Sequence, residues 1–330
     1  MASTEALGDG SLELGYWLSS EEHTPGALVA HARAAEETGF RIAMISDHFA
    51  PWVPHQGNSS FVWSVLGAIG ASTRQLRVGT GVTAAVHRVH PLVIAHAAAT
   101  VESLMPGRFF LGLGTGERLN EGVTGERWPR PAERRAMLEE ALSIMRDLWD
   151  GRTVSHQGDH FRVERARLYT RPDTPPPVVI AASGKASARL AGEQADGVLS
   201  VGGDPEVVDA FEGAGGHGKP RFAQLDVCWA ESDDAARRTV REWWPNAAVP
   251  GPLLTELATP PEFAQVCEVL PDDVVQRAVV SGPDPERYVG AIAHCVAGGF
   301  TTVHLHQVGP DQCGFLDFCA RELLPRFSTT

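Results

Sequence analysis

The run SDHFAPW at 46–52 places an acid, a histidine and two aromatic rings close together in the sequence. Asp47 beside His48 supplies a proton acceptor suited to neutral pH, because histidine side chains change charge in that range. Phe49 and Trp52 offer aromatic surface to a flat ring or to the face of a sugar. These residue types predict proton transfer at a bound ring, although a histidine that caps a helix or is satisfied inside the fold remains an open alternative.

A second cluster is the glycine-rich run GLGTGE at 112–117. A dinucleotide fingerprint, G-x-G-x-x-G, would need a glycine where Glu117 stands, so a nicotinamide site has weak support. The glycines can instead let the backbone approach a flat cofactor, with Glu117 directed into the site. A buried glutamate near a ring nitrogen can hold and pass a proton. The alternative is a solvated glutamate at the start of a loop.

Two further groups carry possible binding chemistry. Ser183, Gly184 and Lys185 join a predicted strand to a predicted helix, where backbone N–H groups and the lysine charge favour a phosphate. Ser183 as a simple helix N-cap is a compatible reading. His304 and His306 share one face of the last predicted strand without a third ligand, so we expect core or barrel-lumen histidines and no metal site.

Alternating strands and helices must bring these groups together. Nine short apolar or β-branched runs predict strands, at 12–17, 41–46, 76–82, 108–114, 178–182, 197–201, 222–229, 278–281 and 302–306. Helical patterns separate them, at 26–38, 62–72, 91–104, 131–150, 185–193, 233–243, 261–269, 285–297 and 311–323. This alternation predicts an α/β fold, namely a (β/α)8 TIM barrel with insertions, in a single domain over 1–330. Nine strands are one more than this barrel needs, so we expect one of them to be an insertion or not a strand. Catalytic groups of such barrels lie at the carboxyl ends of the strands.

Composition excludes several classes of protein. The 41 acidic and 28 basic residues give a net charge of -13, which argues against nucleic-acid and anionic-membrane binding. Only Lys185 and Lys219 are lysines. Five late cysteines, without a C-x-x-C pair, favour reduced thiols in the cytoplasm over disulfides or zinc. We see neither a signal peptide nor the run of about 18 apolar residues that a membrane helix needs.

With these residues placed, the sequence resembles the deazaflavin (coenzyme F420)-dependent glucose-6-phosphate dehydrogenase family, a branch of the bacterial luciferase-like superfamily. The resemblance runs from about Leu12 to Phe327. It rests on SDHFAPW (46–52), RVGTGV (77–82), FLGLGTGERLNE (110–121), VVIAASG (178–184) and FLDFCARELLPR (315–326). It implies a luciferase-like barrel, a homodimer, and hydride transfer between a carbinol carbon and C5 of the deazaflavin.

The same resemblance implies roles for individual residues. His48 and Trp52 would steady the reacting hydroxyl on the substrate side of the ring, and Glu117 would protonate the deazaflavin. The bond between Gly81 and Val82 is expected to be a non-proline cis peptide. The implied cofactor-binding residues are Asp47, Gly81, Val82, Gly116 and Asn120 at the ring, and Ala182, Ser183, Gly184, Gly202 and Gly203 at the phosphate-bearing tail. Lys185 is well placed to join the tail group.

The sequence also departs from the family pattern. Sugar-phosphate members clamp the phosphate with two lysines and an arginine, but Asp204 stands at the first lysine and 220–330 holds none. Of the three clamp residues, only the arginine has a counterpart in this sequence, Arg277. We therefore expect a small, non-phosphorylated alcohol, or the corresponding carbonyl compound in the reverse direction. The alternatives are a sugar-6-phosphate dehydrogenase with a rearranged arginine clamp, an FMN-dependent luciferase-like monooxygenase, and a non-catalytic deazaflavin binder.

Overall fold

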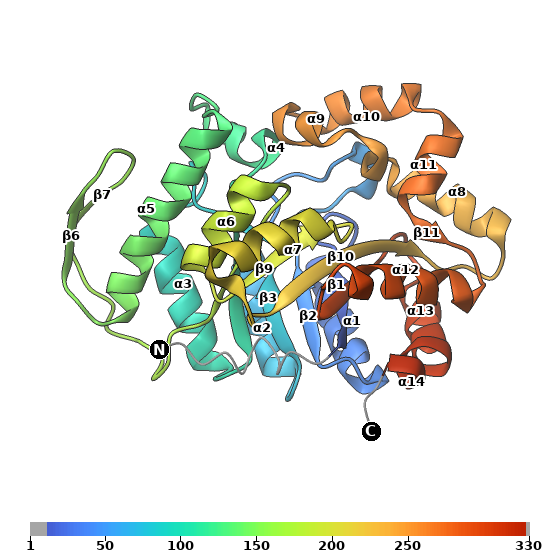
Figure 1. The fold of residues 1–330 in the computed structure, drawn as a ribbon, viewed down its shortest axis with the longest axis horizontal. Coiled ribbons are helices and arrows are strands. Elements are labelled where there is room, and N and C mark those ends of the chain that lie inside the picture. Colours follow the sequence, from blue (N-terminus) through green and yellow to red (C-terminus); the bar gives the residue numbers. More distant parts are fainter. Residues whose placement is uncertain (1–11, 328–330) are drawn as a thin grey trace.

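Eight parallel strands form a closed barrel in the computed structural model, which describes residues 12–327 (Figure 1). Each strand pairs with the next, and the last pairs with the first. In order around the barrel, the strands are β1 (Glu13–Leu18), β2 (Ile42–Ile45), β3 (Arg77–Thr80), β5 (Phe109–Gly114), β8 (Val178–Ala181), β9 (Gly197–Val201), β10 (Arg221–Cys228) and β12 (Thr302–Gln307). The predicted TIM barrel is confirmed.

Helices surround the barrel, and several begin at a proline in the first turn, where its missing N–H costs nothing. The N-cap Thr24 and the C-cap Gly39, with φ of 122°, set the ends of the first helix. The outer helices are α1 (Pro25–Thr38), α2 (Val62–Ser72), α3 (Pro91–Leu104), α5 (Pro131–Trp149), α6 (Lys185–Gln194), α7 (Pro205–Phe211), α12 (Pro285–Ala297), α13 (Gln312–Phe318) and α14 (Leu324–Phe327). None of the helices within 12–327 is long and apolar enough to cross a membrane.

Insertions account for the remaining elements. A hairpin of β6 (Val154–Gln157) and β7 (Arg162–Ala166) lies at the left edge of Figure 1. The short strand β4 (Thr83–Ala84) precedes α3 and pairs with β5, and the short helix α4 (Arg118–Glu121) follows β5. Between β10 and β12 lie α8 (Asp233–Trp243), the 3-10 turn η5 (Pro245–Ala248), α9 (Gly251–Glu256), α10 (Pro260–Val269), α11 (Asp272–Ala278) and β11 (Val280–Ser281).

The ninth predicted strand, 278–281, is not a barrel strand. Ala278 ends α11, and Val280–Ser281 pairs only with Val227 and Cys228 at the end of β10. Its β-branched pair resembles a strand, but the eight barrel positions are already filled. The prediction missed the hairpin β6–β7 and the short helices α7 and α9, because segments this short carry too little periodicity.

The barrel interior is packed with large side chains and contains a buried histidine. Trp17, Met44, Phe110 and Phe222 belong to this inner cluster. His304 lies beside them on β12, and a Cβ on Gly15 would overlap its ring, so glycine is required there. Burial lowers the pKa of His304 to about 3, so this ring is neutral in the folded protein at neutral pH.

We predict that the neutral burial of His304 weakens the fold in acid. Below about pH 6.5 the unfolded chain protonates this histidine and the folded chain does not, so stability falls as pH falls toward about 3. Urea unfolding of the wild type and of His304→Gln between pH 6.5 and 4.5 measures the effect. The difference in unfolding free energy should change by about 1.4 kcal/mol per pH unit, to the disadvantage of the wild type. If the unfolding free energies of the two proteins change with pH in the same way, the prediction is refuted.

Candidate active site

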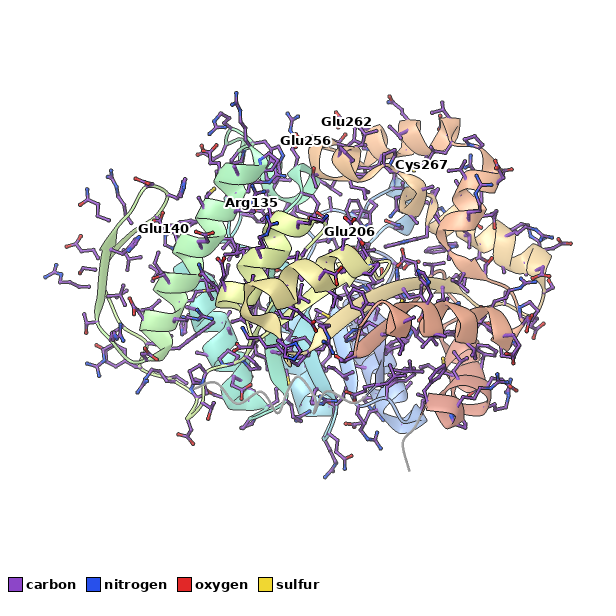
Figure 2. The ribbon with its side chains drawn as sticks, in the orientation of Figure 1. Arg135, Glu140, Glu206, Glu256, Glu262 and Cys267 are labelled. Carbon is purple, nitrogen blue, oxygen red and sulfur yellow. The ribbon has the colours of Figure 1, made fainter. Side chains whose placement is uncertain are left out.

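The chemistry-bearing residues meet at the carboxyl ends of β2, β3 and β5, which are neighbours in the barrel. His48 follows β2, Gly81 follows β3, and Glu117 follows β5. The α9–α10 segment, where Figure 2 labels Glu256, Glu262 and Cys267, lies at the same end of the molecule. This barrel mouth is therefore the candidate active site, as the strand-end rule predicts.

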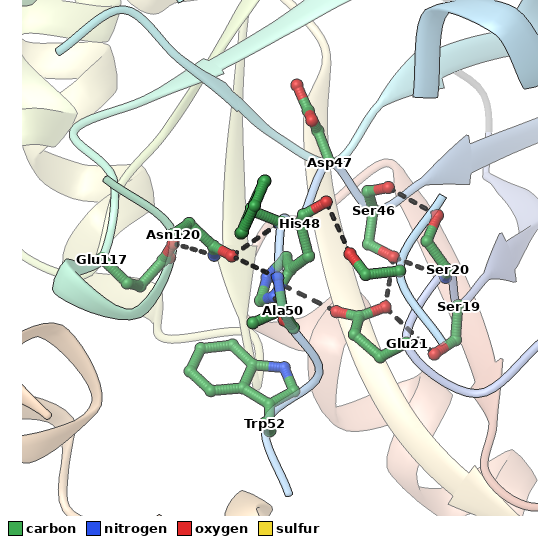
Figure 3. A network of polar contacts seen from close by, with 12 residues as sticks. Ser19, Ser20, Glu21, Ser46, Asp47, His48, Ala50, Trp52, Glu117 and Asn120 are labelled. Atoms are coloured by element: carbon green, nitrogen blue, oxygen red, sulfur yellow. Dashed lines mark hydrogen bonds and ion pairs between the residues drawn. The ribbon is translucent and has the colours of Figure 1, made fainter. Parts of the chain in front are cut away.

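Asn120 joins the two proton-handling groups. Its Oδ1 accepts hydrogen bonds from the backbone N–H groups of Phe49 (2.8 Å) and Ala50 (3.3 Å), in the loop that carries His48. Its Nδ2 donates to Glu117 Oε2 at 3.3 Å. One amide side chain thus holds the histidine loop and the glutamate in a fixed relation (Figure 3). The resemblance assigned Asn120 to the cofactor but did not indicate this bridge.

His48 lies between an aromatic ring and a carboxylate. Its ring centroid is 4.8 Å from that of Trp52. Its Nδ1 lies 3.2 Å from Ala50 O, and its Nε2 lies 3.4 Å from Glu21 Oε1. Nδ1 is placed to donate to Ala50 O, so the lone pair of Nε2, beside Glu21, is left to accept a proton. This geometry suits a group that accepts a proton from a substrate hydroxyl.

Glu21 is a site residue that the sequence analysis missed. Its side chain is buried, and its Oε2 accepts hydrogen bonds from the hydroxyls of Ser46 and of Ser19, the latter at 3.2 Å. Figure 3 shows it facing His48 from the side opposite Asn120. The available signal was the pair of acids, Glu21 and Glu22, just beyond the predicted strand 12–17.

Asp47 is held away from the histidine ring by a buried ion-pair network. Its Oδ1 lies 2.9 Å from Arg88 Nη2, and its Oδ2 accepts from Thr83 Oγ1 at 2.7 Å. Arg88 also pairs with Glu121 through Nε at 3.4 Å. Burial alone would lower the pKa of Arg88, but the two carboxylates raise it. The acid that faces His48 is therefore Glu21, and Asp47 fixes the loop.

The peptide bond between Gly81 and Val82 is cis, which confirms that expectation. A Cβ on Gly81 would overlap the indole of Trp17, which rises from the barrel interior. Gly116 adopts φ of 73°, a left-handed conformation that favours glycine. These glycines let bare backbone line the mouth between His48 and Glu117.

The predicted tail-binding group lies at the ends of β8 and β9, which are also neighbours. Ala182 is buried, Ser183 and Lys185 are exposed, and Gly202 and Gly203 both have positive φ. The N-cap of α6 is Gly184, without a side-chain cap, so Ser183 does not cap this helix. Lys185 Nζ lies 3.2 Å from Glu206 Oε2, in an exposed ion pair.

Arg277 does not join the group at the mouth. It lies on α11, its guanidinium pairs with Asp273 at 2.7 Å, and 69 % of its side chain is exposed. Val275 packs inward, and a residue two positions along a helix points to the opposite side. The role of Arg277 as a substrate ligand stays a prediction. Asp204 caps α7 by accepting from Glu206 N at 2.9 Å.

Known proteins resemble this chain over most of its length. The model of the luciferase-like monooxygenase family matches residues 11–302. An F420-dependent glucose-6-phosphate dehydrogenase of Microbacterium testaceum is 35 % identical, over 96 % of this chain and 97 % of its own. An F420-dependent hydroxymycolic acid dehydrogenase of Mycobacterium tuberculosis is 36 % identical, over 94 % and 87 %. The solved structure of an F420-dependent secondary alcohol dehydrogenase with an F420-acetone adduct superposes with a TM-score of 0.90 at 27 % identity, covering 97 % and 100 %.

We predict that Arg88 is needed for the fold as well as for the site. Arg88→Met leaves Asp47 and Glu121 buried without a cation, which should cost about 3–5 kcal/mol of unfolding free energy. Urea denaturation at pH 7 measures the loss. Arg152→Ala removes an exposed pair with Asp147 and is the control, with an expected change of about 0.5 kcal/mol or less. Equal losses of unfolding free energy in the two variants would contradict the view that Arg88 compensates the buried charges of Asp47 and Glu121.

Proposed function

The chain belongs to the luciferase-like monooxygenase family, and we propose that it is a coenzyme F420-dependent oxidoreductase of neutral alcohols. In this reaction a hydride moves between the carbinol carbon and C5 of the deazaflavin. The observation that carries the proposal is the Asn120 bridge, which links the loop of His48, our proposed proton acceptor, to Glu117, our proposed proton donor. The F420-dependent relatives support the cofactor.

The residues at the mouth fit such a cofactor. Its flat ring matches a mouth lined by bare backbone at Gly81 and Gly116, and its anionic tail matches the exposed end of α6. The residues proposed to line the ring are Asp47, Gly81, Val82, Gly116 and Asn120; Asp47 would act through its loop, because Arg88 and Thr83 bind its buried side chain. The tail-binding residues are Ala182, Ser183, Gly184, Lys185, Gly202 and Gly203.

Bound F420 would supply the hydride acceptor, and the side chains would accept and donate the protons. His48 takes the proton of the substrate hydroxyl, and Glu21 stabilises the resulting charge on the ring. Trp52 packs against His48 and Phe263 and limits where the substrate can lie. Glu117, held by Asn120, delivers a proton on the cofactor side. Reduced cofactor would run the same site toward carbonyl reduction.

The charges around the mouth favour a substrate without phosphate. Glu21 is buried there, Asp204 replaces a clamp lysine, and Arg277 points to solvent. On the far side of Trp52, apolar residues of α9 and α10 pack onto the histidine loop, in a cluster that includes Val53, Leu119 and Phe263. A neutral alcohol with apolar surface suits these surroundings better than an anion does.

A sugar-6-phosphate dehydrogenase is the second candidate. The name of the Microbacterium testaceum relative supports it. It would need other arginines to replace the clamp, and these would have to turn inward when the substrate binds.

We further propose that the protein is a single domain that works as a homodimer in the cytoplasm. Val93, His96, Thr100 and Leu104 are exposed along one face of α3, a surface that a second copy could cover. The cysteines are unpaired, as expected in a reducing compartment. Size-exclusion chromatography with light scattering tests the dimer.

We predict F420-specific binding and a preference for neutral alcohols. Titration of tryptophan fluorescence should show tight binding of F420 and weak or no binding of FMN and NADP. With F420 bound, a secondary alcohol such as cyclohexanol should be oxidised with at least tenfold higher kcat/KM than glucose 6-phosphate. FMN binding without F420 binding would overturn the cofactor. A reversed substrate preference would favour the sugar-phosphate candidate.

We predict separate kinetic roles for the two proton-handling residues. His48→Gln and Glu117→Gln should each lower kcat by about 10²- to 10⁴-fold, because each removes a positioned proton acceptor or donor. The Kd for F420 should change by less than about threefold, since both variants keep the shape of the mouth. Glu139→Gln, on the exposed side of α5, is the control. An unchanged kcat in either variant would remove that residue from the mechanism.

A further inference from the structure

A buried charge cluster lies beside the active site, where β10, β12 and β1 end. Asp226 on β10 and His306 on β12 are directly opposite each other in the register, and both point into the barrel. Glu22 follows β1 and reaches the same histidine. The side chains of Glu22 and His306 are inaccessible to solvent, and that of Asp226 is 11 % exposed. The mechanism above uses none of these three groups.

His306 lies between two buried carboxyl groups and is within hydrogen-bond distance of both. His306 Nδ1 lies 2.9 Å from Asp226 Oδ1, and Nε2 lies 2.9 Å from Glu22 Oε2. When both carboxyl groups are ionised they can only accept, and each ring nitrogen then carries a proton. Burial alone would lower the pKa of His306, but these hydrogen bonds raise it to about 10. Burial also raises the pKa of Glu22, so the three groups hold their protons as one coupled cluster.

The remaining oxygens of the cluster are also held. Glu22 Oε1 accepts from Gly309 N at 2.7 Å, and Asp226 Oδ2 accepts from Trp244 Nε1 at 2.9 Å. The ionisable neighbours of the cluster are Tyr16, Glu21, His23 and Cys228. Because its partners surround it completely, His306 has no ring nitrogen left to bind a substrate.

The cluster is continuous with the catalytic loop through one peptide bond. Glu22 is bound inward by His306, while the adjacent Glu21 faces His48 at 3.4 Å. Asn58, in the loop after His48, donates from its backbone N–H to Glu21 O at 3.1 Å and from Nδ2 to Glu22 O at 3.2 Å. Glu21 and Glu22 therefore share one backbone segment, and Asn58 holds that segment at both carbonyl oxygens.

We propose that Glu22, His306 and Asp226 are positioning residues for proton transfer. They tie the segment after β1 to the ends of β12 and β10 and so hold Glu21 against His48. The proposal rests on the proposed function for its kinetic consequences, but not for the geometry itself. A buried ion pair that only stabilised the barrel would have no specific effect on Glu21.

The primary test is the isosteric variant Glu22→Gln, because His306→Gln would leave two buried carboxylates without a cation. We expect kcat with F420 and cyclohexanol to fall on the order of 10- to 100-fold, with KM and the F420 Kd within about twofold. Amide exchange of Asn58 in the cofactor-free protein should accelerate, while exchange in the barrel strands stays unchanged. Glu140→Gln is the matched control, because Glu140 accepts from His156 Nε2 at 2.9 Å far from the mouth (Figure 2).

A double variant tests whether Glu22 acts through Glu21. If it does, Glu21→Gln/Glu22→Gln should have the same kcat as Glu21→Gln alone. Multiplied losses would overturn the positioning role, and so would wild-type kcat and Asn58 exchange in Glu22→Gln. A wild-type protein that neither binds F420 nor oxidises alcohols would refute the proposed function instead. The exchange of Asn58 in Glu22→Gln then still decides the fate of the positioning proposal.

Discussion

Negative charge that is buried at the barrel mouth has to be compensated, and this constraint organises the site. An unpaired carboxylate in such surroundings costs several kcal/mol, so each one is found with a cation or with several donors. Arg88 lies between Asp47 and Glu121, and His306 lies between Glu22 and Asp226. Glu21 has the hydroxyls of Ser19 and Ser46 and the ring of His48. The same pairs fix the loops that present the reacting groups.

Periodicity and local motifs were sufficient to predict the barrel and the place of its site. The run SDHFAPW follows β2 and GLGTGE ends β5, and these two strands, with β3 between them, bring His48 and Glu117 to one mouth. The cis bond at Gly81 followed from the resemblance and is present. Strand-end rules work here because every barrel strand is parallel, so all carboxyl ends lie on one side.

The compensating partners could not be predicted, because no spacing in the sequence links them. Glu22 and His306 lie at opposite ends of the chain and meet only because β1 and β12 close the barrel. Arg88 reaches Asp47 from the segment after β4. The position of Arg277 is a different case. Its place in the sequence suits a clamp, but the packing of Val275 turns that face of α11 to solvent.

The arrangement of charge also sets what the mouth can bind. At about 6 Å and an effective dielectric constant of about 20, each pair of unit charges of like sign costs about 3 kcal/mol. A phosphate dianion near Glu21 would therefore need strong cations, yet Arg88 and His306 are each already placed between two carboxylates. Affinity for the substrate must then come from packing against Trp52 and the apolar side chains of α9 and α10. When the rest of the substrate makes apolar contacts, its hydroxyl is its main polar group. Hydrogen bonding of this group then directs the carbinol toward His48.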